Sequence, residues 1–445
     1  MNPRETAELL QSLLLALRDD VKPDLDSANA RHRAELIDML LVRMATELES
    51  ADYNSSSPPA VSHQDVDNLA ADTTPDINQR AQLEHSISAF AASEKQRRND
   101  LETRLAEIAA RQSGGGGSGE ELHIPKERFT AYLRQRFPDD PALEVSALTI
   151  IPGGRSKGTL LLETRGAQGE GEIVIRLDFS SMVTGVSVAY EYPVVNALYQ
   201  AGVPVPEPLW LEEKSELTGG AFVAYAKMSG TAMGTLFHSD APAAFVREYA
   251  RVLAQVHSID VENADLADKL TWGDAAHPVR EMVNSFYQRY RNELTRLPLV
   301  DTAFAWLYLQ LDNIGNRKAL VHGDAGLHNT LGDGGRLSAL LDWELAHAGH
   351  PAEDLCYCKQ VVEGIMPWDD FMSAYQEAGG SAISPHEVAF FSVWRSLQLA
   401  IQCLGTRQMF TSGVDQDLRI AAIGYNTLPK FLNILATDLA KFTVR

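Results

Sequence analysis

The chain has 445 residues, with 60 acidic and 39 basic side chains and a formal net charge of −21. This length predicts at least two folding units, each large enough to bury its own core. The acidic balance excludes an ordinary nucleic-acid binder, because such proteins need a basic surface to displace counterions from phosphates. An anionic substrate must therefore be held by a few locally placed cations.

The cysteine count and the hydropathy pattern narrow the setting of the protein. Three cysteines, two of them Cys356 and Cys358, are too few for a disulfide framework, and no Cys/His cluster has zinc-ligand spacing. No run of 18 apolar residues predicts a membrane span, and the acidic N-terminus does not resemble a secretory leader. We expect a soluble protein in a reducing, cytoplasmic setting, with neither nucleic acid nor membrane among its partners.

Residues 1–112 are predicted to form a small helical domain. Apolar residues recur at helical spacing in two early stripes, and a third helix is expected over 78–112, with its charged stretch 94–100 facing solvent. The polar, proline-containing stretch 51–77 is expected to be a loop or disordered. Because no Gly-rich turn or paired His/Asp occurs in this half, we interpret it as a helical partner or stabilising subunit.

Residues 113–119 are a pure run of glycine and serine, which behaves as a flexible coil. Such a run between two well-patterned segments is typical of an engineered joint between two polypeptides. We therefore expect residues 1–112 to be an intramolecular partner of the rest of the chain. Both halves are acidic, which favours apolar docking over charge complementarity.

Residues 120–445 have a different pattern. A short helix is expected at 126–137 and another at 190–200, and from residue 245 onward the pattern is almost entirely helical apart from one β-like island. The expected β-rich runs are 145–151, 159–164, 172–178, 206–211, 221–227 and, for the island, 319–343. This order predicts an α+β, two-lobed protein-kinase-like fold, with a β-rich N-lobe over 120–228 and a helical C-lobe over 229–445.

The β-like island carries the residues that suggest chemistry. Asp324 follows His322 and Gly323, and Asn329 comes after four intervening residues, the separation found in the kinase catalytic loop. A hairpin-like turn then leads to an apolar strand that ends at Asp342. Phosphoryl transfer needs a carboxylate at the acceptor hydroxyl and oxygen ligands for magnesium. The alternative, a hairpin with incidental surface acids, does not explain the complete set.

This set resembles the aminoglycoside phosphotransferase-like family of small-molecule kinases, also called choline-kinase-like, over about residues 125–430. The motifs that carry the resemblance are residues 322–329, the Asp-Trp-Glu at 342–344, and the later segment 349–355. At His350 the family usually has Asp, and we expect this departure to have a structural effect.

The resemblance implies roles for the residues of these motifs. Asp324 would be the catalytic base or would orient the acceptor hydroxyl. Asn329 and Asp342 would hold magnesium. His322 and Asp354 would brace the catalytic loop.

Upstream segments would bind the nucleotide. The Gly-rich turn before the second strand matches the family's phosphate loop, so Gly153, Gly154, Ser156 and Lys157 are candidate phosphate contacts. A Gly-rich hairpin is weak evidence by itself, and an ordinary turn is the alternative.

A cation and a hinge complete the predicted nucleotide site. Arg176 stands where kinases place the lysine that bridges the phosphates, and its planar fork would clamp phosphate. Glu191 is at the family's helix position for the ion-pair partner of that cation. Backbone groups of Ala226 and Met228 would meet adenine. An ordinary surface arginine remains the alternative for Arg176.

The fold alone does not decide the acceptor. Residues 6–10 and the following helix resemble the small helical proteins encoded beside a bacterial kinase of levulinic-acid breakdown, which phosphorylates 4-hydroxyacyl-CoA. Similar kinase domains are joined to acyl-CoA dehydrogenases in animals. We therefore expect a hydroxyacyl-CoA kinase that uses ATP and Mg²⁺. The candidate contacts for coenzyme A phosphates are Arg280, Arg289, Arg291, Arg395 and Arg407.

Two other functions stay open. The first is an antibiotic phosphotransferase, whose cationic substrates would suit the acidic balance but would not explain a helical partner. The second is a non-catalytic nucleotide-binding scaffold, which the intact Asp324, Asn329 and Asp342 disfavour.

Overall fold

The computed structural model of the chain describes a defined set of residues. They are 10, 17, 34–35, 37–44, 61–71, 75–109, 124–151, 157–167, 169–178, 186–262, 264, 266–414 and 418–443. The chain forms two compact units, each built from distant segments. The helical unit comprises Met1–Ser118, Met282–Gly315 and Ala389–Arg445, and the mixed unit comprises Gly119–Glu281 and Asn316–Val388. The predicted glycine-serine linker at 113–119 lies outside the described residues.

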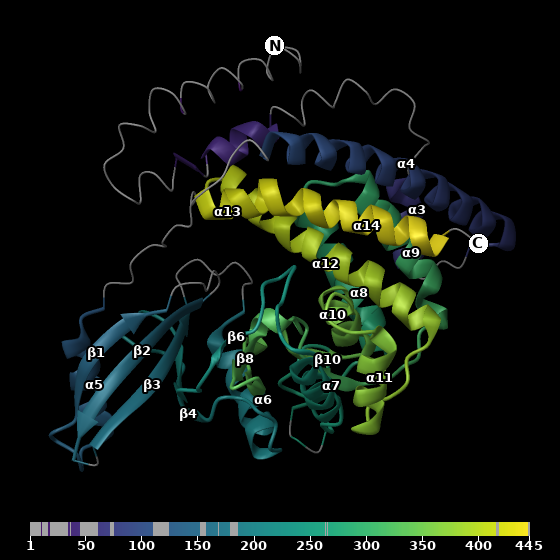
Figure 1. Cartoon of the computed structure of the whole chain (residues 1–445). Coiled ribbons are helices and arrows are strands. Elements are labelled where there is room, and N and C mark those ends of the chain that lie inside the picture. The colour runs from purple at the N-terminus through teal and green to yellow at the C-terminus, as the bar shows by residue number, and fades with distance from the viewer. Residues whose placement is uncertain are drawn as a thin grey trace. The chain divides into compact units, whose positions relative to one another are not determined.

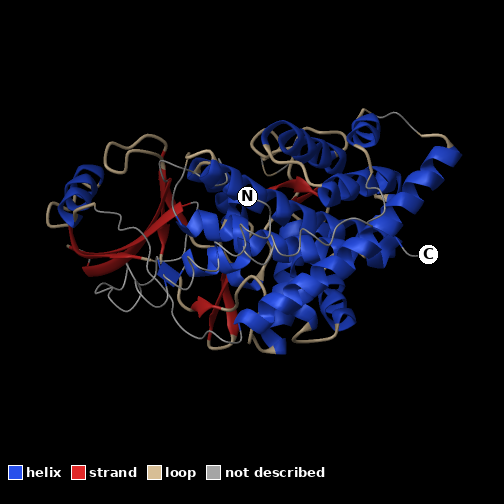
Figure 2. Cartoon of the chain, turned by 90° about the horizontal axis from the view of Figure 1, so that it is seen from above, coloured by secondary structure: helices blue, strands red, loops and turns tan. Residues whose placement is uncertain are grey.

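The mixed unit begins with a five-stranded antiparallel sheet in the order β1-β2-β3-β5-β4 (Figure 1). Figure 2 shows its long strands as one curved layer. Helix α5 (Lys126–Arg136) packs against β1, and its Phe129 and Leu133 are fully buried in the core of the sheet. The strands are β1 (Glu144–Ile150), β2 (Lys157–Gly166), β3 (Gly169–Asp178), β4 (Pro208–Glu212) and β5 (Phe222–Ala226).

Helix α6 (Val188–Gln200) packs against β4 and β5. It starts at Ser187, whose extended backbone and hydroxyl, which accepts a hydrogen bond from the Ala189 N–H, are those of an N-cap. The helix contains Pro193, which has no N–H to donate to the carbonyl four residues earlier. Its first turn is therefore less firmly joined to the rest of the helix than an ordinary first turn.

The rest of the mixed unit combines helices with two small sheets. The predicted hairpin is present as β8 and β9. Gly334 and Gly335 at its turn have φ values of 56° and 80°, and positive φ at both positions is what a two-residue hairpin turn requires. The elements of this part of the mixed unit are β6 (Thr231–Ala232), α7 (Ala243–His257), β7 (Ala319–Val321), η4 (Leu327–Asn329), β8 (Thr330–Asp333), β9 (Arg336–Leu340), η5 (Trp343–Leu345), β10 (His347–Gly349), α10 (Ala352–Glu363) and α11 (Trp368–Glu377).

The helical unit contains no strand among its described residues. Helix α4 runs along α14 and also contacts α9, which in turn contacts α3 (Figure 1). Helices α8 (Pro278–Glu293) and α12 (Pro385–Thr411) pass from the mixed unit into this one. The other elements are α3 (His63–Ala70), α4 (Ile77–Ala109), α9 (Pro298–Gln310), η3 (Leu311–Asn313), α13 (Leu418–Ala422), η6 (Ile423–Thr427) and α14 (Leu428–Thr443).

Helix α9 is buried on all sides. Every residue from 299 to 309 is buried, including the polar Asp301 and Thr302. A helix that is apolar around its whole circumference is stable only when neighbours cover every face. Helices α3, α4 and α14 provide some of that cover, and Ile87 and Phe90 of α4 are buried. The segment 61–109 thus contributes to the core of this unit.

Polar contacts also join α3 to this core. Asp67 accepts a hydrogen bond of 2.5 Å from the Tyr287 hydroxyl and lies 3.3 Å from Arg291 Nη2. His63 Nε2 lies 2.9 Å from Asp301 Oδ2, and Arg296 pairs with the other oxygen of that carboxylate. The docking of α3 therefore combines apolar burial with specific charge and hydrogen-bond contacts.

The structure differs from the sequence-based expectations at two places in the first half of the chain. The prediction of a loop over 51–77 is wrong for residues 63–70, which form α3 behind a capping box of Ser62 and Asp65. That Ser-x-x-Asp pattern was the available signal. The charged stretch 94–100 is not wholly solvated, because Glu94 is buried and bonded to Arg97 and Arg98.

Helix α12 is long and apolar enough to cross a membrane by length and composition, and 78% of its most apolar window is buried inside the structure. Burial of that extent is typical of the core helix of a globular protein.

Candidate functional site

The catalytic loop begins where strand β7 ends. His322 and Gly323 are buried, and Asp324 follows with 23% of its side chain exposed. Gly323 has a φ of 77°, and a Cβ there would collide with the Leu345 carbonyl oxygen, so no other residue fits this turn. Asp324 is thus the first residue of this loop whose side chain is partly exposed.

Asn329 and His328 surround the Asp324 carboxylate. Asn329 Nδ2 donates to Asp324 Oδ2 and to the Asp324 carbonyl oxygen, both at 3.0 Å. Oδ1 lies 3.5 Å from His328 Nε2, at the outer limit of a hydrogen bond. Burial raises the pKa of Asp324, but His328, Tyr357 and His322 together lower it more, so the pKa lies below its usual range. Asp324 is therefore ionised at neutral pH and can accept a hydrogen bond from a substrate hydroxyl.

Asp354 fixes the start of the catalytic loop through hydrogen bonds to its backbone. Its fully buried carboxylate accepts hydrogen bonds from the N–H groups of His322, at 2.7 Å, and Gly323, at 2.9 Å. His257 Nε2 lies 3.0 Å from the same carboxylate, and His257 Nδ1 lies 2.8 Å from the Tyr375 hydroxyl. These are the contacts expected of a residue that braces the loop.

His322 connects this loop to the Asp-Trp-Glu segment. Its Nε2–H donates to the Leu341 carbonyl at 2.9 Å, and its ring packs on Trp343 with the centroids 4.3 Å apart. The Leu341 N–H in turn donates to the Asn329 carbonyl at 2.8 Å. Asn329 and Asp342 therefore lie on neighbouring stretches of chain, as the motif spacing predicts.

Asp342 has an unusual backbone. Its φ of 67° places it in the left-handed region, which only a few per cent of non-glycine residues adopt. Strained conformations of this kind persist at functional sites, where surrounding contacts fix them. Here the contact is with Arg176, whose Nη2 donates to Asp342 Oδ1.

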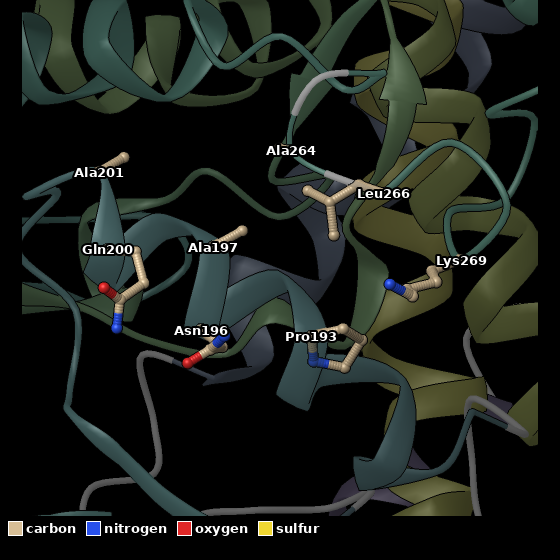
Figure 3. A pocket seen from close by; sticks show the side chains of 8 residues that line it. All are labelled: Pro193, Asn196, Ala197, Gln200, Ala201, Ala264, Leu266 and Lys269. Carbon is tan, nitrogen blue, oxygen red and sulfur yellow. The ribbon is translucent and has the colours of Figure 1, made fainter.

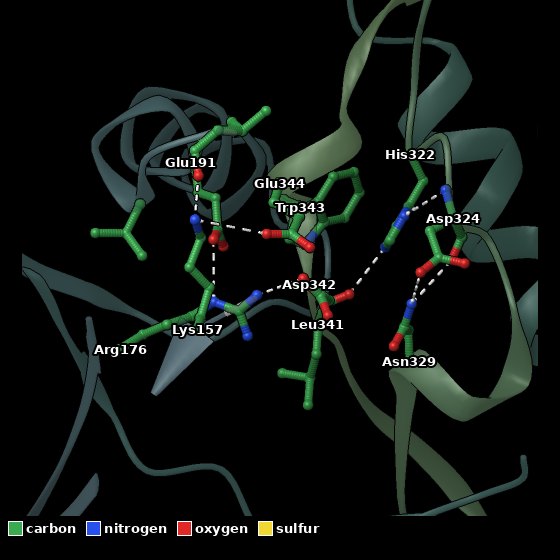
Figure 4. Close-up of polar contacts among 12 residues, drawn as sticks. Lys157, Arg176, Glu191, His322, Asp324, Asn329, Leu341, Asp342, Trp343 and Glu344 are labelled. Atoms are coloured by element: carbon green, nitrogen blue, oxygen red, sulfur yellow. Dashed lines mark hydrogen bonds and ion pairs between the residues drawn. The ribbon is translucent and has the colours of Figure 1, made fainter. Parts of the chain in front are cut away.

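Arg176 on β3 bridges two carboxylates (Figure 4). Its Nε lies 3.0 Å from Glu191 Oε1 on α6, and its Nη2 meets Asp342. Burial raises the pKa of Glu191 to about 7, against the opposing effect of Arg176. Burial lowers the pKa of Arg176, but Glu191 and Asp342 raise it more, so it lies above its usual range. The predicted cation and its predicted helix partner thus form an ion pair, and their role in binding phosphate stays a prediction.

Lys157 is a buried cation that lies close to two carboxylates. Its side chain is 1% exposed, and its ammonium lies 3.1 Å from Asp178 Oδ1 and 3.8 Å from Glu344 Oε2. It also donates to the Val186 carbonyl oxygen. Contact between Lys157 and a nucleotide phosphate remains a prediction.

Three carboxylates converge beside Arg176. One oxygen each from Glu191, Asp342 and Glu344 lie within 4.8 Å of one another. Hard oxygen donors of this kind suit magnesium, so this donor set fits the ion that the fold family implies. Sequence reasoning assigned no role to Glu344, and its place two residues after Asp342 was the signal that could have identified it.

The other predicted nucleotide contacts are in the Gly-rich turn and in the segment at the end of β5. Gly153, Gly154 and Ser156 lie outside the described residues. Ala226 ends strand β5, and its N–H donates to the Glu207 carbonyl at 3.0 Å. Met228 follows two residues later and is half-buried. Their contacts with adenine stay predictions.

The structure shows the surroundings of His350 and of several candidate coenzyme A contacts. His350 is fully buried, with Nε2 lying 3.0 Å from Glu387 Oε1, so the family's usual Asp would face a carboxylate here. Among the candidate coenzyme A contacts, Arg291 pairs with Asp67, and Arg407 lies over the Tyr425 ring at 4.7 Å. Arg395 is buried.

The α+β fold and a site with a loop aspartate, a neighbouring asparagine and a paired cation define a kinase-like phosphotransferase. Residues 147–391, more than half of the chain, match the phosphotransferase enzyme family, APH. The chain therefore belongs to this family and is an ATP-dependent kinase. The predicted fold class and the predicted enzyme class are both confirmed.

Comparison with individual proteins gives two groups of relatives. The chain is 28% identical over 241 residues to acyl-CoA dehydrogenase family member 11 of Gallus gallus, a match covering 53% of this chain and 30% of that protein. It is 30% identical over 179 residues to acyl-CoA dehydrogenase family member 10 of Mus musculus, covering 38% and 16% respectively. The chain thus spans less than a third of the length of these relatives.

A solved structure supports the fold. A Ralstonia eutropha protein assigned as an aminoglycoside phosphotransferase matches with a TM-score of 0.54 and 20% identity, covering 72% of this chain and 99% of that one. At this identity the match shows the fold and carries no information on the substrate.

Proposed function

We propose that this enzyme transfers the γ-phosphoryl group of ATP to the hydroxyl of a 4-hydroxyacyl-CoA. The observation that carries the transfer chemistry is the arrangement of Asp324, held by Asn329, next to Asp342 and the Arg176–Glu191 pair. This arrangement supplies a carboxylate for the acceptor, oxygen ligands for a metal and a cation for phosphate, which are the groups that phosphoryl transfer requires.

In the proposed reaction, Asp324 acts on the acceptor hydroxyl. The acceptor oxygen attacks the γ-phosphorus, the bond from that phosphorus to the bridging oxygen breaks, and ADP leaves with the electron pair. Asp324 accepts the hydroxyl proton and, before that, orients the hydroxyl for attack. Its lowered pKa suits orientation more than strong basicity, because a weak base accepts the proton late in the transfer.

Asn329 and Asp342, which the family resemblance assigns to magnesium, and Glu344, whose carboxylate lies beside those of Asp342 and Glu191, are the side chains that would hold the ion. The bound ion would neutralise charge that develops on the transferred phosphoryl group. Arg176 would contribute to the same task, because its Nη2 contacts Asp342 and so lies beside the proposed metal ligands. When phosphate binds, the guanidinium can exchange some of its contact with Asp342 for phosphate oxygens.

The acyl-CoA acceptor rests on two further observations. The relatives described above are named as acyl-CoA dehydrogenase family members. The helical segment 61–109 packs on α9 and α14, which suits the proposal that residues 1–112 are a partner of the kinase. An acyl-CoA ester would carry most of its charge on the coenzyme A phosphates, so basic side chains such as Arg280 or Arg289 are the proposed contacts.

An ADP-release assay on the full chain tests the acceptor. We expect turnover with 4-hydroxyvaleryl-CoA, none with kanamycin, and a background rate without acceptor. The reverse pattern would make the enzyme an antibiotic phosphotransferase. ATP binding with no turnover on any acceptor would favour a nucleotide-binding scaffold, and the Asp324→Asn variant serves as the inactive control.

The partnership of residues 1–112 has its own test. A protease site placed within 113–119 allows the joint to be cut after folding. The tether alone can hold two weakly interacting fragments together, because it raises their effective concentration toward about millimolar. After the cut, only their own affinity remains, and we expect the two fragments to stay bound when micromolar cut protein passes through a size-exclusion column. Separation of the two fragments would contradict the partnership. We also propose a cytoplasmic setting, which is supported by three buried cysteines that form no disulfide.

A further inference from the structure

Helix α6 carries Glu191 in its first turn, and this turn has little support from the helix itself. Pro193 removes the hydrogen bond to the Ala189 carbonyl, which would otherwise join the first turn to the second. A pocket of about 450 Å³ borders the rest of α6, lined by Asn196, Gln200 and Lys269 among others (Figure 3). The helix therefore has room on one flank, and contacts outside the helix must fix the position of Glu191.

The Tyr190 side chain makes one set of such contacts. Its hydroxyl donates to the Ala346 carbonyl at 2.7 Å and accepts from the Thr271 N–H at 3.0 Å. Ala346 lies two residues after Glu344, so this contact joins α6 directly to the segment that carries Asp342 and Glu344. The contact sits next to Glu191 in sequence and acts on the same turn.

Thr271 extends the connection toward the catalytic loop. Its carbonyl accepts from the Ala348 N–H on β10 at 3.1 Å, and β10 pairs with β7, which leads into His322. The next residue, Trp272, has a φ of 59° and packs edge-on against His347, with ring centroids 4.9 Å apart. A strained tryptophan backbone persists only where its surroundings over-determine it, which marks this stretch as a fixed anchor.

Lys157 and Asp178 make a second set of contacts with the same turn. Asp178 accepts from the Ser187 hydroxyl at 2.6 Å and from the Val188 N–H at 2.9 Å, so it caps the start of α6. The Lys157 ammonium joins Asp178 to Glu344. Besides the Glu191–Arg176–Asp342 bridge, the first turn of α6 is thus tied to residues 342–346 through Tyr190 and through Lys157.

We propose that Tyr190 is a positioning residue that holds Glu191 where it pairs with Arg176, and so sets the affinity of the enzyme for its nucleotide. Lys157 is the second tie of the same device. The inference rests on the proposed function, because it assumes that the Arg176–Glu191 pair contacts the phosphates of ATP. Tyr190 touches neither reacting group and acts through Glu191.

The test is the Tyr190→Phe variant, which keeps the ring and removes only the hydroxyl. Loss of one hydrogen-bonded tie predicts an ATP Kd and KM raised about fivefold, with the KM of the acceptor unchanged. Tyr199→Phe, an exposed tyrosine on the same helix, is the matched control and should leave both constants unchanged. An acceptor KM that rises as much as the ATP KM would indicate a general structural effect and would overturn the proposal.

A double-mutant cycle gives the sharper readout. If Tyr190 acts through Glu191, then Tyr190→Phe should have no further effect on ATP affinity in a Glu191→Gln background. Full additivity of the two changes would refute the inference. The Lys157→Met variant should show the same dependence on Glu191, which provides a second arm if Tyr190→Phe folds poorly.

Failure of this inference is distinguishable from failure of the proposed function. If the unchanged chain binds no ATP in a calorimetric titration with magnesium, the proposed function fails and this inference with it. If the unchanged chain binds ATP and Tyr190→Phe binds it equally well, only the inference fails.

Discussion

The catalytic region of the mixed unit and the packed helices of the helical unit differ in the kind of interaction that stabilises them. Around Asp324, identity matters at nearly every position, because each side chain meets a defined partner such as Asn329 or Asp354. Along α9, eleven consecutive residues are buried and most contribute only apolar volume. The first region is built from specific contacts and the second from burial.

This difference determines how each region should respond to substitution. In the catalytic region, a change of one atom type should alter rate or nucleotide affinity while the fold persists. In the helical unit, a change should alter the free energy of unfolding and leave the chemistry alone. Four substitutions test this contrast, in order of decreasing expected effect.

Asp324→Asn should have the largest effect. The amide cannot accept the hydroxyl proton, so kcat should fall by about 10³-fold, while the Kd for ATP stays within about twofold because Asp324 faces the acceptor. ADP release and calorimetry measure the two quantities. Residual activity above a tenth of the original would remove Asp324 from the mechanism.

Asp354→Asn should test whether the catalytic region also depends on buried charge. The carboxylate accepts two backbone N–H groups and pairs with His257, and breaking a buried pair of this kind costs about 3 kcal/mol of the free energy of unfolding. Urea titration measures the loss. Exposed Asp369→Asn on α11 is the control and should change stability by less than about 0.5 kcal/mol.

The pH dependence of the same variant gives a second check. Burial raises the pKa of Asp354, but His257 and His322 together lower it more, so the folded-state pKa lies below the usual value. Stability from this group is therefore present above the unfolded-state pKa and is lost as the pH falls through the folded-state pKa. The variant lacks that carboxyl, so its stability should fall less steeply with acid. An acid dependence identical to that of the unchanged chain would contradict the assignment.

The catalytic region could be predicted largely from the sequence because its motifs are local. Asp324 and Asn329 share one loop, and Asp342 follows one strand later, so spacing alone brings them together. The Arg176–Glu191 pair was suggested by family resemblance, since no local rule joins a strand residue to a helix fifteen positions away. The ties made by Lys157 and Tyr190 were missed, because they depend on the tertiary placement of α6 against residues 344–346.

The helical unit was predictable only in outline. Helical spacing indicated α4, but the partners of its apolar face, α9 and α14, lie more than 180 residues later in the sequence. Helix α3 was missed because its short apolar content, Val66 and Leu69, is weaker than the loop signal of the surrounding stretch. The apolar pattern of a helix predicts that one of its faces is buried, but it does not indicate which element covers that face.

Asp67→Ala should have a moderate effect, confined to stability. The carboxylate accepts from Tyr287 and lies beside Arg291, and loss of a hydrogen bond to a charged group lowers the free energy of unfolding by about 1.5 kcal/mol. Gln64→Ala on the same helix removes only an exposed contact with Asn68 and is the control. The rate with saturating substrates should not change. A lower kcat with unchanged stability would mean that the helical unit contributes to the chemistry.

Tyr225→Phe should have the smallest effect and tests the contrast from the other side. The Tyr225 hydroxyl is buried near Glu191 and Arg176, yet no described residue forms a hydrogen bond with it. A buried hydroxyl without a partner lowers stability, so its removal should leave the free energy of unfolding unchanged or raise it by up to about 1 kcal/mol. Thermal unfolding and the ATP Kd measure the outcome. A loss of stability or of ATP affinity would mean that the hydroxyl has a partner, such as an ordered water or the nucleotide, and that even this position belongs to the region of specific contacts.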